Sequence, residues 1–248
     1  MLKNKVAIIT GAGSGIGEAI ALLFAENGAK VVVSDVDVKG GKRVVKKIEK
    51  AKGTAMFVEA DVSDPAACEA LVQTTVKKYK RLDVAVNNAG IGGAQAPVGE
   101  YGIEDWQKVI NINLNGVFYG MHYQIPAMAK NKRGVIVNMA SILGQVGTPQ
   151  SPAYVAAKHG VIGLSQSAAL AYAKQKIRVN AVGPGYIKTP LVTENLDKKQ
   201  LEQLVQMHPV GRLGKPQEVA ELVLWLCSDK ASFVTGAYYN VDGGYLAR

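Results

Sequence analysis

The chain has 248 residues, of which 48% are hydrophobic and 20% are charged. This composition is that of a globular protein and excludes an intrinsically disordered one. No apolar run reaches the roughly 18–20 residues needed to cross a bilayer. The apolar run Val6–Ile9 near the N-terminus is also shorter than a signal-peptide core of roughly 7–15 residues. We therefore expect a cytoplasmic protein with no membrane partner.

The formal net charge is +9, which raises the question of a nucleic-acid or other anionic partner. The basic residues are scattered over several helical stretches and are not interleaved with aromatic residues on one element. We interpret them as solvated helix faces and expect no nucleic-acid partner. The two cysteines, Cys68 and Cys227, lack metal-ligand spacing, so we expect two reduced, buried thiols and no metal site.

Short β-branched runs alternate with longer stretches of helical periodicity along the chain. Strands are expected at Val6–Thr10, Val31–Ser34, Thr54–Val58, Leu82–Asn87, Val135–Met139, Ile177–Val182 and Tyr238–Val241. Helices are expected at Gly15–Asn27, Val38–Ala51, from Pro65 after a capping Asp64, in two segments of Ile103–Lys130, and at Pro152–Lys174 and Pro216–Ser228. The polar stretch Leu191–His208 is interpreted as a mobile helical lid. This alternation predicts one α/β domain over residues 1–248, with a doubly wound parallel sheet of about seven strands and helices on both faces.

A glycine-rich turn lies between the first expected strand and the first expected helix. Gly11, Gly15 and Gly17 have the spacing G-x-x-x-G-x-G, which lets a pyrophosphate approach the backbone at a helix N-terminus. Asp35 ends the second strand, 18 residues after Gly17, where an acid accepts hydrogen bonds from the adenosine ribose. Its carboxylate would repel a 2′-phosphate, so NAD(H) is favoured over NADP(H). Asp61 is a candidate for the adenine amino group, with capping of the next helix as the alternative.

Two Tyr-x-x-x-Lys pairs occur in the sequence, and their context separates them. Tyr154 and Lys158 share a helix face, and Ser141, 13 residues before Tyr154, follows a predicted strand. Tyr172 and Lys176 have no serine in that position. Sites of open α/β sheets form at the carboxyl ends of the strands, so only the first pair can face such a serine.

Together these residues resemble the short-chain dehydrogenase/reductase family, whose fold is a Rossmann-type sheet. The matching pieces run in family order over most of the chain. They are Thr10-Gly11-xxx-Gly15-x-Gly17, Asp61, Asn87-Asn88-Ala89-Gly90, Asn113, Ser141, Tyr154-xxx-Lys158, Pro184-Gly185 and Thr189, with the ending Val241-Asp242-Gly243-Gly244-Tyr245 also similar.

The resemblance implies roles for the matching residues. Tyr154 would be the general acid/base, Ser141 would bond the substrate oxygen, and Asn113 would order a water linked to Lys158. Lys158 would also hold the nicotinamide ribose and lower the pKa of Tyr154. Members that prefer NADP often have a basic residue where this chain has Ser14. The implied cofactor contacts are Gly11, Ser14, Gly15, Ile16, Gly17, Asp35, Asp61, Val62, Asn88, Ala89, Gly90, Tyr154, Lys158, Pro184, Gly185, Ile187 and Thr189.

Simple electrostatics agrees with the role of Lys158. A free tyrosine has a pKa of about 10, so a base near neutrality needs a shift of roughly 2–3 units. One ammonium about 4 Å away supplies about 4 kcal/mol at an effective dielectric of about 20, which covers that shift. In oxidation Tyr154 would take the alcohol proton as hydride leaves the carbon, and in reduction it would return the proton.

The expected substrate pocket is mostly apolar and uncharged. Besides Ser141 and Tyr154, its candidate residues are Leu143, Gln145 and Tyr186. We therefore expect a small to medium neutral secondary alcohol or ketone, cyclic or aryl-bearing. A glucose-type sugar 1-dehydrogenase, a 3-oxoacyl-carrier-protein reductase and a non-catalytic dinucleotide-binding sensor or scaffold are the alternatives.

Histidine chemistry is not expected. His159 lies next to Lys158 but points about 100° away from it on the helix, so we interpret it as a packing or surface residue. His122 and His208 show no partner pattern. Finally, the family resemblance implies a homotetramer built from the helices near 103–130 and 152–174 and from the last strand.

Overall fold

A single seven-stranded sheet organises the protein in a computed structural model that describes residues 1–193 and 197–247. Its strand order is β3-β2-β1-β4-β5-β6-β7, and every neighbouring pair is parallel. The predicted doubly wound Rossmann-type sheet is thereby confirmed. The strands are β1 Val6–Thr10, β2 Lys30–Asp35, β3 Thr54–Glu59, β4 Val84–Asn87, β5 Gly134–Met139, β6 Ile177–Pro184 and β7 Tyr238–Val241.

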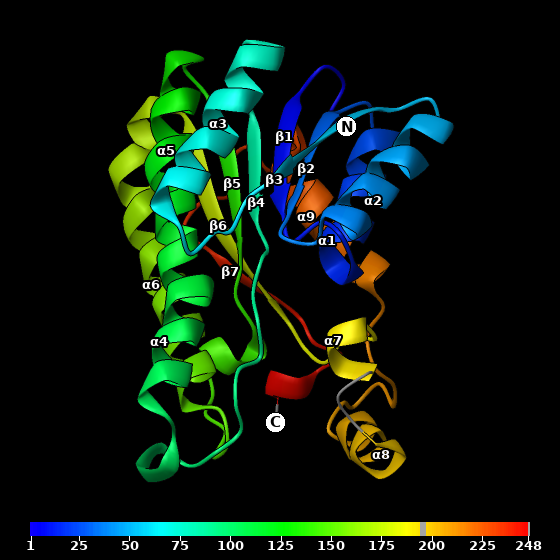
Figure 1. Ribbon diagram of the computed structural model, residues 1–248, viewed down its shortest axis with the longest axis vertical. Coiled ribbons are helices and arrows are strands. Elements are labelled where there is room, and N and C mark those ends of the chain that lie inside the picture. The colour runs from blue at the N-terminus through cyan, green and yellow to red at the C-terminus, as the bar shows by residue number, and fades with distance from the viewer. Residues whose placement is uncertain (194–196, 248) are drawn as a thin grey trace.

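Helices cover both faces of the sheet (Figure 1). One core packs α1 and α9 against the sheet with part of α2, and the other packs α3, α5 and α6. The buried central strands are almost wholly apolar, as expected for a parallel sheet covered on both sides. The helices are α1 Gly15–Glu26, α2 Val38–Lys50, α3 Pro65–Tyr79, α4 Ile103–Ile110, α5 Gly116–Lys130, α6 Pro152–Tyr172, α7 Pro190–Thr193, α8 Lys198–Gln206 and α9 Pro216–Cys227.

Local signals account for the ends of several elements, of which some match the predicted bounds and others differ from them. The Asp64 carboxylate accepts a hydrogen bond from the Ala66 N–H, and Pro65 occupies the first turn of α3. β4 begins two residues later than predicted because the Asp83 carboxylate bonds the Val6 N–H at 2.9 Å and also pairs with Arg81. At its carboxyl end, β6 continues two residues beyond its predicted end, to Pro184.

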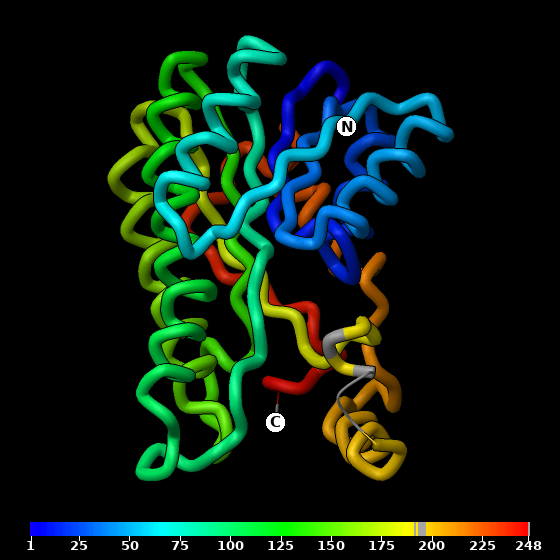
Figure 2. Tube along the Cα trace, viewed as in Figure 1, coloured from blue at the N-terminus to red at the C-terminus, as the bar shows by residue number. Residues whose placement is uncertain are grey.

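The stretch from Ile103 to Lys130 forms α4 and α5, joined by a π-helical turn at Asn111–Asn115 that the sequence did not predict. In the predicted lid, α7 and α8 are helical, and residues 194–196 lie outside the described part of the chain. α8 stands beyond the carboxyl edge of the sheet (Figure 1). The end of the chain returns beside the segment after β6 (Figure 2), where the Gly185 N–H bonds the Val241 carbonyl.

The order of the strands reverses between β1 and β4. The chain moves from β1 outward to β3 and then crosses back to β4. Crevices at the carboxyl ends of the strands beside such a switch point are where open α/β sheets bind ligands. The glycine-rich turn after β1 and the Asn-Asn-Ala-Gly segment after β4 therefore meet at this position.

Candidate active site

The turn after β1 has the geometry of an anion-binding loop. Gly11 and Gly15 have φ of +62° and +56°, which only glycine adopts without strain. A Cβ on Gly11 would lie 2.8 Å from the Ala89 Cα, so the loop also needs glycine for its close approach to the segment after β4. Ser14 starts α1 and makes no side-chain capping bond. The N–H groups of the first turn of α1, including Ile16 and Gly17, are thus available to a phosphate.

Thr10 joins the ends of β1 and β4. Its Oγ1 accepts hydrogen bonds from the N–H groups of Asn88 and Ala89 at 3.0 and 3.1 Å. In return the Asn88 amide donates to the carbonyls of Thr10 and Gly11. The predicted cofactor residues on the two strands are therefore parts of one rigid network, with Gly90 directly after it.

Asp35 lies at the end of β2 and faces the glycine-rich turn. Its carboxylate accepts hydrogen bonds from the Gly13 N–H at 2.7 Å and the Asp37 N–H at 2.9 Å. Arg43 donates to the carbonyl of the same Gly13 and forms an ion pair with Glu18. This corner of the site therefore presents the partly exposed carboxylate of Asp35, and the guanidinium of Arg43 is already paired with Glu18.

Asp61 follows β3 and is exposed. Its carboxylate bonds the N–H and hydroxyl of Ser63, and Asp64 caps α3 in its place. The capping alternative for Asp61 is therefore wrong, and its role toward adenine stays a prediction. The adjacent Val62 is buried and lies against Gly116, where a Cβ would come within 2.8 Å of the valine Cγ2.

The Ser141, Tyr154 and Lys158 side chains converge at the carboxyl end of β5. Lys158 is only 3% exposed, and its Nζ donates a 2.7 Å hydrogen bond to the carbonyl of Met139, the last residue of β5. The same Nζ lies 5.5 Å from the centre of the Tyr154 ring. Ser141 lies two residues beyond β5 and shares a hydrogen bond with the Tyr154 side chain, and its Oγ accepts a bond from the Leu143 N–H at 3.2 Å. The three side chains that the sequence singled out are thus brought together.

Burial shifts both titratable groups of this set toward their neutral forms. It lowers the pKa of Lys158 to about 8. It also raises the pKa of Tyr154, while a hydrogen bond with Ser141 acts in the opposite direction. The net shift of the Tyr154 pKa is therefore upward, opposite to the expected direction, because desolvation is its largest cause. The Lys158 ammonium is directed at the Met139 carbonyl.

Asn113 is fully buried in the π-helical turn between α4 and α5. Its side-chain oxygen accepts from the Ile91 N–H at 2.8 Å, and its amide donates to the Ile91 carbonyl at 2.7 Å. The amide of Asn113 is thereby committed to the main chain after β4. Its role in ordering a water for Lys158 stays a prediction.

The second Tyr-x-x-x-Lys pair is not a site. Tyr172 is the last residue of α6, and Lys176 lies beyond the helix with φ of +59°. The helical spacing that would place the two side chains on one face is therefore broken.

The segment after β6 forms the opposite wall. Pro184 ends the strand, Ile187 is buried, and the Thr189 hydroxyl donates to the Ile187 carbonyl at 3.3 Å. A Cβ on Gly15 would lie 3.3 Å from the Thr189 Cγ2, so this wall faces the glycine-rich turn directly. Among the predicted substrate residues, Leu143 is buried and Gln145 is exposed.

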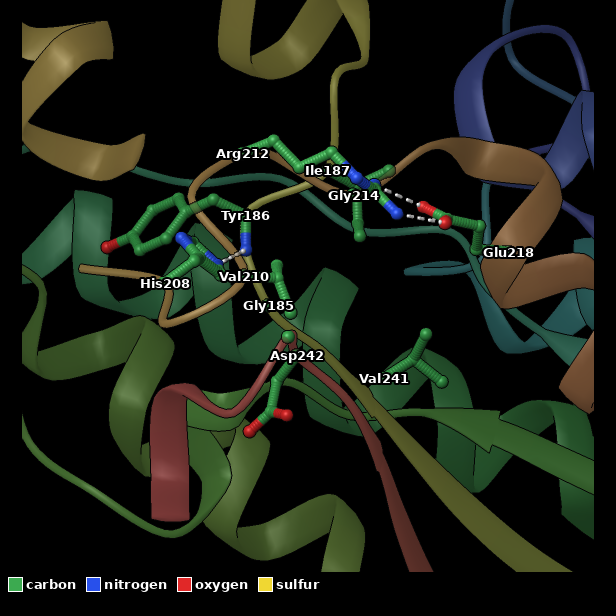
Figure 3. Close-up of a pocket in the computed structure, with 11 residues that line it drawn as sticks. Gly185, Tyr186, Ile187, His208, Val210, Arg212, Gly214, Glu218, Val241 and Asp242 are labelled. Atoms are coloured by element: carbon green, nitrogen blue, oxygen red, sulfur yellow. Dashed lines mark hydrogen bonds and ion pairs between the residues drawn. The ribbon is translucent and has the colours of Figure 1, made fainter. Parts of the chain in front are cut away.

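Two residues near the site were missed by sequence reasoning. The Tyr238 hydroxyl, from β7, donates a 2.8 Å hydrogen bond to the Ser141 carbonyl. His208 is buried beside Tyr186 at a cavity of about 130 Å³ (Figure 3). No motif marks either position, because their partners come from distant segments. The cavity is lined by Gly185, Tyr186, Ile187, His208, Val210, Arg212, Gly214, Glu218, Val241, Asp242 and Gly243.

Neither a metal site nor a membrane segment is found in the described part of the chain. Residues 1–193 and 197–247 contain no group of three or more His, Cys, Asp or Glu side chains suited to hold a metal ion. Over the same ranges, no helix combines the length and the apolar character that crossing a bilayer requires.

A dinucleotide cradle that leads to a Ser–Tyr–Lys set defines the class of an oxidoreductase acting on alcohols and ketones, and the comparisons agree. A family model described as enoyl-(acyl carrier protein) reductase matches residues 11–246. Cyclohexanol dehydrogenase of an Acinetobacter species is 49% identical over 99% of this chain and 96% of its own. The 3-oxoacyl-acyl-carrier-protein reductase of Thermotoga maritima is 44% identical over 99% of both chains. The crystal structure of a levodione reductase superposes with a TM-score of 0.95 at 37% identity, covering 100% of this chain and 99% of that one. The chain belongs to the short-chain dehydrogenase/reductase family.

Proposed function

We propose that this protein transfers a hydride between NAD(H) and a neutral cyclic secondary alcohol or ketone. The observation that carries the proposal is the convergence of Ser141, Tyr154 and buried Lys158 at the carboxyl end of β5, across from the glycine-rich turn. When bound, the nicotinamide would supply or accept the hydride.

The protein's own groups handle the proton. The Tyr154 hydroxyl takes the proton of the substrate alcohol in oxidation and returns it to the carbonyl oxygen in reduction. The Ser141 hydroxyl donates to the same oxygen, where negative charge develops. The Lys158 ammonium, shielded from water, favours the phenolate that forms in between. We assign Asn113 the role of ordering the water that links Lys158 to solvent.

The preference for NAD(H) is supported by the corner at Asp35. The residues fit an adenosine ribose with free hydroxyls, because a carboxylate accepts such hydrogen bonds. A 2′-phosphate would meet that charge, while Arg43 is engaged by Glu18. We assign the remaining cofactor contacts as the sequence predicted them, from Gly11 to Thr189.

The substrate class is supported by the uncharged side chains of the candidate pocket residues and by relatives named for cyclohexanol and levodione. Leu143, Gln145 and Tyr186 are proposed to line the pocket, with α7 and α8 as its cover. Reduction of a carrier-bound 3-oxoacyl group is the second candidate, favoured by the relative from Thermotoga maritima. The NADPH preference expected of that activity conflicts with Asp35.

The test is an assay with NADH, NADPH and their oxidised forms over cyclohexanol, cyclohexanone, glucose and an acyl-carrier model thioester. We expect turnover of the cyclic pair with the NAD couple. Tyr154→Phe should lose at least about a thousandfold in kcat and still bind NADH, whereas Tyr172→Phe, the matched control on the same helix, should keep full activity. Equal losses in both variants, or turnover of the thioester alone, would contradict the proposal.

We also propose that the protein works in the cytoplasm as a homotetramer. Leu170 on α6 is 85% exposed, Phe233 before β7 is fully exposed, and Ile103 and Phe118 on α4 and α5 are also open to solvent. Exposed apolar side chains on these elements are what an interface between copies would cover. Light scattering should give four chains, and a Leu170→Glu/Phe233→Glu double variant should give a smaller particle.

A further inference from the structure

His208 follows α8 and is 3% exposed. Its Nδ1 lies 2.7 Å from the Leu204 carbonyl in α8, and its Nε2 lies 3.2 Å from the main-chain nitrogen of Tyr186. A carbonyl only accepts and a main-chain N–H only donates, so Nδ1 carries the hydrogen and Nε2 is the acceptor. The imidazole is therefore neutral and held in one tautomer by two segments of the chain.

The ring is also enclosed by aromatic and backbone atoms. Its centre lies 5.9 Å from that of Tyr186 and 5.5 Å from that of Tyr245 in the C-terminal turn. A Cβ on Gly185 would lie 2.8 Å from the Nε2 and 3.0 Å from the Asp242 Cα, so the imidazole packs directly against the main chain at Gly185. Figure 3 shows the imidazole directed at the Tyr186 nitrogen.

The segment that His208 holds is a wall of the active site. On its other side, the Gly214 N–H bonds the Tyr186 carbonyl at 3.0 Å and the Lys188 N–H bonds the Gly214 carbonyl at 2.8 Å. Residues 185–189 are thus fixed between Gly214 and His208, and they end at Thr189, which faces the glycine-rich turn. His208 is a polar link from this wall to the end of α8.

We propose that His208 is a positioning residue. Its Nε2 sets the main chain at Tyr186 and so couples the docking of α8 to the wall that confines the substrate at Tyr154. The inference rests on the proposed function, because it assigns that wall to the alcohol or ketone. His208 acts through Tyr186 and does not touch the reacting atoms.

Two amide variants separate the hydrogen bonds of the imidazole. In His208→Gln the side-chain amide oxygen reaches the position of Nε2 and restores the acceptor for Tyr186. In His208→Asn the shorter amide reaches only the position of Nδ1 and keeps the bond to Leu204. Tyr245→Leu is the packing control, because it removes a ring contact and leaves both hydrogen bonds. His208→Met fills the ring volume without a strong acceptor and serves if the Asn variant does not fold.

We expect His208→Asn and His208→Met to raise the KM for the ketone at least about tenfold and to lower kcat less, with the Kd for NADH within about twofold. His208→Gln and Tyr245→Leu should stay within about threefold of the wild type. Equal KM values in the Gln and Asn variants, wild-type kinetics in the Asn and Met variants, or an equal loss in Tyr245→Leu would overturn the proposal.

Hydrogen exchange at the Tyr186 amide tests the same link without turnover. The exchange should accelerate at least about tenfold in His208→Asn and return toward the wild-type rate in His208→Gln. An unchanged rate in the Asn variant would refute the coupling. A wild-type enzyme that turns over no alcohol or ketone, with the exchange pattern as expected, would refute the proposed function and leave the link between His208 and Tyr186 standing.

Discussion

Burial of the Lys158 ammonium is expected to lower the unfolding free energy of the protein, although the proposed reaction requires this side chain. Its pKa falls from an ordinary value of 10.5 to about 8 because the ammonium is buried. A shift of that size corresponds to about 3 kcal/mol of folding free energy at pH 7. Lys158→Met removes this penalty but leaves the Met139 carbonyl without its donor, which costs about 1 kcal/mol. The net gain is about 2 kcal/mol, or roughly 4–8 °C in Tm for a chain of this size.

The gain depends on pH in a defined direction. The folded-state pKa lies below the unfolded one, so between about pH 8 and 10.5 the unfolded chain binds more protons. Stability of the wild type therefore rises with pH across that window, and the burial penalty is complete below it. The Tm difference between Lys158→Met and the wild type should be largest at pH 7 and should disappear or reverse near pH 10.5.

The assay is thermal unfolding from pH 7 to 10.5, with turnover measured in parallel. Lys158→Met should be inactive and more stable at pH 7. Lys174→Met is the control, because Lys174 follows the same helix and its exposed side chain is solvated in the folded and unfolded chains. A lower Tm for Lys158→Met at pH 7, or a Tm difference that does not change with pH, would refute the reasoning.

Three further outcomes follow from the same contacts. Two like charges about 5 Å apart repel by about 3 kcal/mol at an effective dielectric of about 20, and we expect half of this repulsion at Asp35 because its side chain is partly exposed. Asp35→Asn should therefore shift the NADH/NADPH ratio of kcat/KM toward NADPH by roughly tenfold. Asp37→Asn, at an exposed position, should leave this ratio unchanged. Asn113→Ala leaves both main-chain groups of Ile91 without partners, so we expect a loss of about 2–4 kcal/mol in unfolding free energy and a lower kcat. Asn115→Ala, in the same turn, should lose little stability, and equal losses in the two variants would disprove this assignment. Burial raises the pKa of Cys68 to about 11 and that of Cys227 to about 12, so a thiol reagent at pH 8 should label neither until the chain unfolds, and rapid labelling of the native protein would contradict their burial.

The parts of the fold that the sequence predicted are those set by local signals. The start of α2 at Val38, the Asp64–Pro65 start of α3 and the whole of β1 match their predicted bounds, because caps and β-branched runs act over a few residues. The glycine-rich turn and the Ser141–Tyr154–Lys158 set were likewise predictable, since their spacing along strands and helices determines their geometry.

The parts that were missed depend on contacts between distant segments. The π-helical turn places Asn113 against Ile91, 22 residues away, and helical periodicity does not register one extra residue in a turn. His208, just after α8, meets Tyr186, just after β6, although 22 residues separate them along the chain. The pKa of Tyr154 was expected in the wrong direction because a sequence gives the distance to an ammonium more readily than the degree of burial.

The burial that costs stability at Lys158 is also what makes this lysine effective. In water an ammonium about 4 Å from a phenolate contributes about 1 kcal/mol, too little to hold the charged form near neutrality. Excluding water multiplies that attraction, but it also lowers the pKa of the lysine itself. The Met139 carbonyl offsets part of this cost by accepting a hydrogen bond from the Lys158 Nζ. Gly90 leaves room beside Nζ, since a Cβ on Gly90 would lie 3.7 Å from Nζ and 2.9 Å from the Asn113 Oδ1. A larger residue at Gly90 should therefore impair proton transfer before it impairs folding, because it would crowd the Lys158 and Asn113 side chains and leave the cores on both faces of the sheet intact.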